Sequence, residues 1–186
     1  AGASSVCSNT AIGCGALCSL TDPVAATGGS NVAIGTGSLK SAVTGVASNI
    51  AIGDSTLCSL TAGGFNSVVG VGAGRLLTTA CSNSLFGYLS GGGRTGGDLN
   101  VAFGRNAMGT PISGCGGSNN TSIGSCSLFA VDADCNVAVG FCAGRLLTTG
   151  AQNVLLGPNV QAPVSTVSCQ LALGFDATNN WLTGNS

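Results

Sequence analysis

Apolar residues recur along this chain in short runs that begin with Asn and close with Gly, as in Asn31-Val32-Ala33-Ile34-Gly35. Further copies occupy residues 9–13, 49–53, 66–70, 83–87, 100–104, 120–124, 136–140 and 153–157, with a weaker copy at 170–174. The closing glycines lie 22, 18, 17, 17, 17, 20, 16, 17 and 17 residues apart. A period this short is typical of a solenoid, in which each repeat buries its apolar side chains against its neighbours.

Each apolar run is too short for an ordinary helix. Its alternation and its β-branched residues favour a strand of about five residues. The sequence therefore predicts an all-β fold, a parallel β-solenoid (β-roll) of about ten coils of about 17 residues. We expect one domain over residues 1–186, with coils over about 9–175 and a C-terminal cap over about 176–186, in which Trp181 covers the last coil.

The two faces of each strand carry different side chains. The fourth motif position is always bulky, and alternation along a strand predicts that this column fills the core. The third position looks the other way and is mostly small, so we expect it to pack against another chain. The alanines of this predicted interface column are Ala33, Ala51, Ala102 and Ala138.

The recurring Asn and Gly have backbone reasons to recur. Glycine supplies the positive φ that a sharp corner needs. Asparagine bonds to nearby backbone, and amides stacked in register form a ladder. We therefore interpret both columns as structural repeat residues. The clearest examples are Asn31, Gly35, Asn49, Gly53, Asn136 and Gly140.

Composition narrows the functional classes. Only 6% of residues are charged and 44% are hydrophobic, which excludes a highly charged disordered chain. The net charge of −1 predicts no nucleic-acid partner, and the short apolar runs predict no membrane insertion. Because the chain begins Ala1-Gly2 without an initiator Met, we expect a processed form or a fragment.

Ten cysteines and no histidine stand out, and the usual zinc-site spacings are absent. This usage fits an oxidising, extracellular setting, with buried free thiols as the alternative. Equivalent positions on successive coils lie about 4.8 Å apart, within the Cα range of a disulfide. We therefore predict that Cys126 and Cys142 are bonded or in contact, with Cys115 and Cys135 as a second candidate pair.

Three stretches interrupt the regular spacing, at residues 22–30, 90–98 and 109–119, and loops of this kind are expected to contact partners. The last ends in a glycosylation sequon, which makes Asn119 a candidate acceptor. The segment Ala-Gly-Arg-Leu-Leu-Thr-Thr occurs twice and carries Arg75 and Arg145. We favour a structural role for both arginines over a binding role.

The sequence offers little for catalysis. There is no histidine and no Glu, so the usual catalytic triads are excluded. Asp132 and Asp134 are close enough to share a face in an extended stretch, which makes them weak candidates for Ca²⁺, although a solvated turn is the preferred interpretation. We predict that the protein is not an enzyme and uses no cofactor.

The unit N-x-A-I-G-x-x-[AS]-L, carried best by residues 31–39 and 136–153, resembles the head repeats of trimeric autotransporter adhesins. It is more similar still to the 17-residue repeats of bacteriophage and large-virus tail-fibre proteins. The resemblance covers about residues 9–175. It implies a left-handed parallel β-roll, three chains side by side, and a role as a stalk or a receptor-contacting head.

We therefore expect a structural and adhesive fibre segment, extracellular or on a virion surface. Its main partner is itself, as a homotrimer or a fibril, and its inserted loops are the expected contacts for a host receptor or surface glycan. One alternative is an ice- or crystal-binding solenoid, for which Thr78-Thr79 and Thr148-Thr149 are the regular threonines. The other is a solenoid carbohydrate-active enzyme, with Asp132 and Asp134 as its carboxylates.

Overall fold

The fold is seen in a computed structural model, which describes residues 8–20, 29–43, 45–110, 116–176 and 178–185. The described residues form strands and turns without a helix. The strands are β1 (Thr10–Ile12), β2 (Val32–Ile34), β3 (Val46–Ala47), β4 (Ile50–Ile52), β5 (Gly63–Gly64), β6 (Ser67–Val69), β7 (Ser84–Phe86), β8 (Val101–Phe103), β9 (Thr121–Ile123), β10 (Val137–Val139), β11 (Val154–Leu156), β12 (Gln170–Gly174) and β13 (Asn180–Asn185). Most are three residues long, shorter than the five expected.

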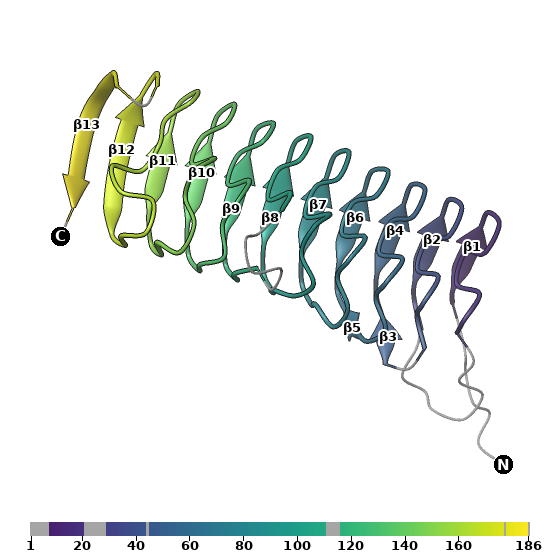
Figure 1. Ribbon diagram of the computed structural model, residues 1–186. Helices are drawn as coiled ribbons and strands as arrows, with labels where there is room; N and C mark the ends of the chain where they lie inside the picture. The colour runs from purple at the N-terminus through teal and green to yellow at the C-terminus, as the bar shows by residue number, and fades with distance from the viewer. Residues whose placement is uncertain (1–7, 21–28, 44, 111–115, 177, 186) are drawn as a thin grey trace, which may run out of the picture.

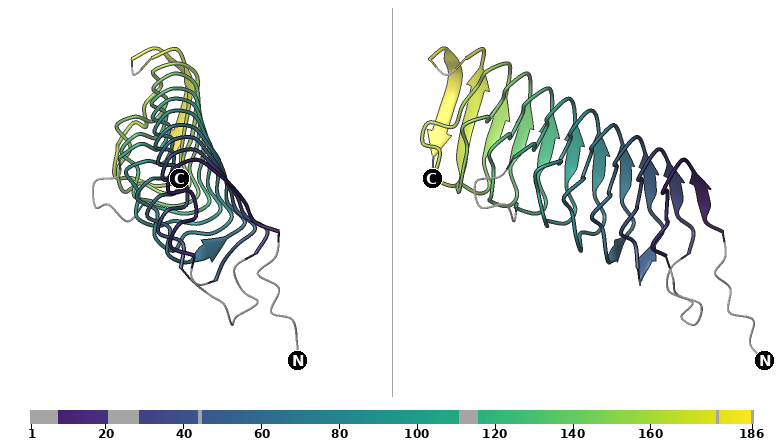
Figure 2. Two further views of the ribbon diagram at one scale, coloured as in Figure 1. Left: turned by 90° about the vertical axis from the view of Figure 1, so that its right-hand side faces the viewer. Right: turned by 45° about the vertical axis from the view of Figure 1, so that its right-hand side comes forward.

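One sheet runs the length of the molecule (Figure 1), in the order β1-β2-β4-β6-β7-β8-β9-β10-β11-β12-β13. Every pair up to β12 is parallel, and each strand sits in register on the equivalent residues of the next, as with Ala33 opposite Ala51. A second small sheet joins β3 and β5. Figure 2 shows the coils following one another along a single axis. The predicted parallel β-solenoid is confirmed.

The motif asparagines form a continuous ladder inside the solenoid. Asn31 Nδ2 donates to Asn9 Oδ1 at 3.1 Å, and Asn31 Oδ1 in turn accepts the Asn49 backbone N–H at 3.0 Å. Asn136 Oδ1 accepts both the backbone N–H and the side-chain amide of Asn153 at 3.0 Å. From Asn31 to Asn153 the ladder residues are buried. Asparagine recurs because one side chain satisfies backbone donors of the next coil that no strand partner reaches.

The motif glycines form a second column, stacked directly above one another. From Gly13 to Gly157 their φ values lie between 123° and 141°, including 131° at Gly35, 133° at Gly53 and 138° at Gly140. A Cβ at Gly53 would lie 2.7 Å from the Gly70 carbonyl oxygen. The positive φ and the close approach both require glycine, so the predicted structural role of this column is confirmed.

The interior is filled in a way that reverses the predicted faces. Ala33, Ala51, Ala102 and Ala138 are fully buried in the protein's own core, so the prediction that they form an exposed interface column is wrong. The bulky fourth position points outward instead. Ile12 and Phe103, for example, are 58% and 57% exposed. A coil of about 17 residues is narrow, so most strands send a small side chain into it, with Leu85 and Leu155 as exceptions.

In several coils the interior volume is taken instead by a Leu or Met from the turn opposite the strand. Motif position nine holds Leu39, Leu57, Met108 and Leu128, all fully buried. Their φ values are 42° to 51°, a left-handed conformation that costs roughly 1–2 kcal/mol in an L-residue. Burying a Leu or Met side chain contributes about 1.5–3 kcal/mol, so the hydrophobic gain offsets the strain.

The C-terminal end of the sheet is covered by main chain. Strand β13 pairs antiparallel with β12, from Gln170 opposite Asn185 to Gly174 opposite Asn180. A cap therefore exists as predicted, but the predicted role of Trp181 is not what the structure shows. Trp181 is 67% exposed and packs edge to face against Phe175, with ring centroids 4.7 Å apart.

Candidate interaction surface

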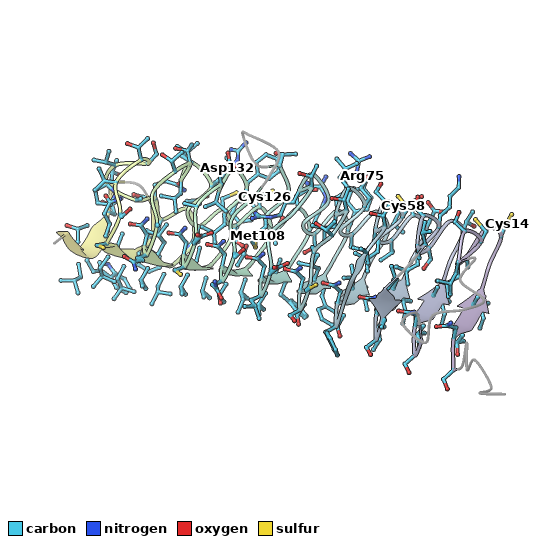
Figure 3. The ribbon with its side chains drawn as sticks, turned by 90° about the horizontal axis from the view of Figure 1, so that it is seen from below. Cys14, Cys58, Arg75, Met108, Cys126 and Asp132 are labelled. Atoms are coloured by element: carbon cyan, nitrogen blue, oxygen red, sulfur yellow. The ribbon has the colours of Figure 1, made fainter. Side chains whose placement is uncertain are left out.

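The outer side of the long sheet is an uncharged and mostly apolar surface, which we call the outer apolar face. It consists of the second and fourth motif positions of the parallel strands, from Thr10 and Ile12 on β1 to Leu171 and Leu173 on β12. In most strands the central residue is buried and both flanking residues are at least partly exposed. Figure 3 shows side chains projecting from this side of the strands along the whole row.

This surface carries no charge. None of its second or fourth positions is Asp, Glu, Lys or Arg, and every fourth position is aliphatic or Phe. Phe86 and Phe103 stack on adjacent strands, with centroids 5.5 Å apart. The sequence contained this signal, because both positions that flank the small residue are mostly apolar, whereas a solvated sheet face carries polar side chains.

The face is large for a protein surface left in water. The sheet has eleven strands and only β13 is antiparallel, so ten parallel strands form the face. At about 4.8 Å per strand the face is about 43 Å long, and three residues make it about 10 Å wide. The footprint of the whole face is about 430 Å² and is mostly apolar, so it is comparable in size with the largest apolar patches of monomers, which often mark an interaction site.

The apolar surface widens toward the C-terminal end. Phe141 and Phe175, which directly follow motif glycines, are 56% and 57% exposed. A shallow hollow of about 430 Å³ lies between Val139, Leu156 and Leu173 on the face and Phe175 and Trp181 beside it. Large, exposed aromatic side chains of this kind are enriched among the residues that contribute most to protein interfaces.

The predicted cysteine contact is present. Cys126 and Cys142 occupy the same position on adjacent coils, and their side chains hydrogen-bond to each other. Both are free thiols, so the structure shows a contact and no bond. Burial and the neighbouring Cys126 raise the pKa of the Cys142 thiol, and Arg145 acts in the opposite direction. Cys115 lies outside the described residues, and Cys135 is an exposed free thiol.

The region around Asp132 and Asp134 holds a buried arginine side chain, that of Arg94. Arg94 replaces a core residue at motif position twelve, where other coils have Leu60, Leu77 or Leu147, and it is 2% exposed. Its Nη2 donates to the Gly117 carbonyl oxygen at 2.6 Å. Burial lowers the pKa of Arg94 to about 10, while Asp132 and then Asp134 act to raise it.

The Arg94 guanidinium changes the interpretation of Asp132 and Asp134, the weak candidates for a Ca²⁺ site. Asp134 Oδ1 accepts the Ser118 backbone N–H at 2.7 Å, and the carboxylate charges of both aspartates face Arg94. Among the described residues no group of three or more His, Cys, Asp or Glu side chains is placed to hold a metal ion. The arrangement supports a structural role for Asp132 and Asp134. Arg94 itself lies in the core, contrary to the expectation that residues 90–98 form a contact loop.

Two further candidate sites are placed by the structure. Asn119 is exposed, whereas Asn120 is buried in the ladder, so of the two overlapping sequons only the first has an accessible Asn. In the ice-binding alternative, Thr79 and Thr149 are exposed, whereas the other threonine of each pair bonds to the next coil: Thr78 Oγ1 donates to the Thr95 carbonyl oxygen at 2.9 Å, and Thr148 Oγ1 to that of Ser165 at 3.2 Å. Those two hydroxyls are thus used within the solenoid.

Comparisons with protein-family models, with curated proteins and with solved structures gave no match for this chain. The resemblance to adhesin and tail-fibre repeats therefore stays a prediction. Within the residues that the structure describes, no helix is long and apolar enough to cross a membrane.

Proposed function

We propose that this protein is a structural and adhesive subunit of an extracellular or virion-surface fibre, which associates with copies of itself through the outer apolar face. The observation that carries the proposal is the uncharged face along the sheet, with Ile12, Phe103 and Ile123 each at least 40% exposed. Removing such side chains from water contributes about 25 cal/mol per Å². Self-association is the simplest way to cover a face that repeats in every coil.

The geometry favours association side by side. The face is straight and runs along the solenoid axis (Figure 1), so parallel packing of several solenoids covers it along its whole length. End-to-end growth by further parallel coils is less favoured, because the antiparallel strand β13 occupies the free edge of β12. A homotrimer, as the repeat resemblance implies, places three such faces around one central axis.

A disulfide between Cys126 and Cys142 belongs to the same proposal. The two thiols are already in contact on adjacent coils, so a bond requires little movement. With a small-molecule disulfide such as oxidised glutathione as oxidant, two protein thiols give one protein disulfide and two glutathione thiols. The new bond would join adjacent coils in an oxidising environment.

The test is a single charge placed on the face. Phe103→Asp puts a carboxylate on an exposed part of the outer apolar face, and burial of an unpaired charge costs several kcal/mol. We expect the association constant to fall at least about a hundredfold, measured by sedimentation equilibrium. Leu146→Asp is the matched control, because Leu146 is 62% exposed and is not part of the outer apolar face.

Two results would contradict this proposal. One is a wild-type protein that stays monomeric up to its solubility limit. The other is an equal loss of association in Phe103→Asp and Leu146→Asp, which would place the contact elsewhere.

A further inference from the structure

A second surface feature lies on the ridge formed by motif position ten. Most coils place a thiol or a larger side chain there. The residues at this position in the first eight coils, in order, are Cys18, Lys40, Cys58, Arg75, Gly92, Gly109, Phe129 and Arg145. The two successive glycines interrupt the ridge and leave a notch of about 210 Å³, lined by Arg75 on one side and Phe129 on the other. Figure 3 places Arg75 and Cys58 on the side of the molecule away from the strands.

The glycines of the notch are required by packing. A Cβ at Gly109 would lie 2.9 Å from Phe129 Cε2, and a Cβ at Gly92 would lie 2.9 Å from the Gly72 carbonyl oxygen. Both distances are shorter than ordinary van der Waals contact between such atoms. The notch is therefore built into the stacking of the coils, and a side chain at either glycine would have to displace its neighbours.

The lining combines one cation, two polar groups and an apolar wall. Arg75 is exposed, and no carboxylate pairs with it among the described residues. Asn106 contributes an amide and Thr110 a hydroxyl, while Phe129 and Leu89 contribute apolar surface. No Asp lines the notch, so the guanidinium charge is not neutralised there. This set of groups suits a ligand that is anionic at one end and both hydroxylated and apolar at the other.

We propose that the notch binds one acidic sugar unit, a uronic acid, of a surface glycan. The sugar carboxylate pairs with the Arg75 guanidinium, a geometry that allows two parallel hydrogen bonds. The Asn106 amide and the Thr110 hydroxyl bond to ring hydroxyls, and the C–H groups of the ring pack on Phe129 and Leu89. Pockets that enclose drug-sized ligands measure about 300–1,000 Å³, so a notch of 210 Å³ admits one ring and leaves the rest of the glycan outside.

This inference rests on the proposed adhesive role for its biological meaning, and it names the ligand class of that role. Inorganic phosphate also satisfies Arg75, but it has no apolar surface for Phe129. A neutral hexose fits the apolar wall but has no charge for Arg75. The three probes therefore separate a uronic-acid site from a simple anion site and from a general sugar site.

The experiment is a ligand-observed NMR titration with glucuronic acid, glucose and inorganic phosphate at neutral pH and low salt. We expect glucuronic acid to bind at least tenfold more tightly than either of the others. Arg75→Gln should weaken glucuronic acid binding at least tenfold, and Phe129→Leu at least threefold. Lys40→Gln is the matched control: Lys40 is an exposed cation on the same ridge outside the notch, and its loss should change the affinity less than twofold.

Several outcomes would overturn the inference. Glucose binding as tightly as glucuronic acid would remove the role of Arg75. Phosphate binding as tightly and displacing the sugar would reduce the notch to an anion site. Equal losses in Arg75→Gln and Lys40→Gln would mean non-specific attraction to cations. Sedimentation of the same samples tests the proposed fibre assembly separately from the sugar site, because the Phe103→Asp protein should no longer self-associate but should still bind glucuronic acid.

Discussion

The asparagine ladder makes a quantitative prediction at Asn100, a ladder residue that is 2% exposed. Asn100 Oδ1 accepts the Asn120 backbone N–H at 3.0 Å and the Asn120 side-chain amide at 3.2 Å. Asn100 Nδ2 donates to Asn83 Oδ1 at 3.1 Å and to the Gly117 carbonyl oxygen at 3.0 Å. The substitution Asn100→Ala removes all of these bonds at once.

The cost depends on which partners are left without a bond. Asn83 Oδ1 still accepts the Asn100 backbone N–H, and the Gly117 carbonyl oxygen still accepts Arg94 Nη2. The Asn120 amide still donates to Ser118 and Ala133. The buried Asn120 backbone N–H, however, loses its acceptor, and an orphaned buried donor costs about 1–3 kcal/mol. With the lost packing, we expect the free energy of unfolding to fall by about 2–4 kcal/mol.

The measurement is urea unfolding followed by far-UV circular dichroism, at one protein concentration because association also stabilises the fold. Asn119→Gly is the control: it deletes an exposed amide beside the ladder at a position with φ of 58°, which glycine adopts freely. We expect that change to stay within about 0.5 kcal/mol. If Asn100→Ala were equally neutral, the ladder would be a consequence of the stacking and would not stabilise it.

Two other predictions concern the motif-glycine corner at Gly87 and the thiols of Cys126 and Cys142. Gly87→Ala should lower the free energy of unfolding by at least about 3 kcal/mol, because Gly87 has φ of 130° and a Cβ there would lie 2.6 Å from the Gly104 carbonyl oxygen. The control is Gly15→Ala, which should cost only about 1 kcal/mol because Gly15 has φ of 70° and open space around it. Equal losses for the two variants in urea unfolding would contradict the packing argument. Oxidised glutathione should convert Cys126 and Cys142 to a disulfide, seen as the loss of two hydrogens by mass spectrometry and absent in Cys142→Ser. Since the pKa of Cys142 is raised, its thiolate is scarce at pH 7, and the rate should increase about tenfold from pH 7 to pH 8; a flat rate would speak against thiolate attack by Cys142.

The repeat itself could be predicted because its backbone requirements are visible as residue types. Gly35 is glycine for its φ of 131°, and Asn31 is asparagine for its ladder bonds. Both requirements recur in the first nine coils, so periodicity alone indicates the parallel stacking and the Cys126–Cys142 contact. The burial of Arg94 could not be predicted in this way, because it depends on which carbonyl oxygens the coils that follow place around the core position.

The prediction of which strand face points into the core is wrong because it rests on side-chain size alone. Bulky aliphatic residues are buried in most proteins, so the sequence predicts that the fourth position lies in the core. The core of a single coil, however, already holds Leu57 from the turn opposite the strand, and Ala51 leaves room for it. Where the strand does carry a Leu, the turn that packs against it has glycine at motif position nine: a Cβ at Gly91, in the coil of Leu85, would lie 2.9 Å from Leu85 Cδ1, and one at Gly144, in the coil before that of Leu155, would lie 2.7 Å from Leu155 Cδ1.

This exchange between strand and turn shows that the interior has a fixed capacity. A Leu on the strand is accommodated where its own coil or the neighbouring coil has glycine at motif position nine, so the large residues of the fourth position have no space inside. They are nevertheless Ile, Val, Leu or Phe in every coil, including Ile123 and Val139 at 40% and 36% exposed, and none has become polar. Side chains that are excluded from their own core but are apolar in every coil support the proposed self-association, because the outer face of a second subunit would cover them with the same period.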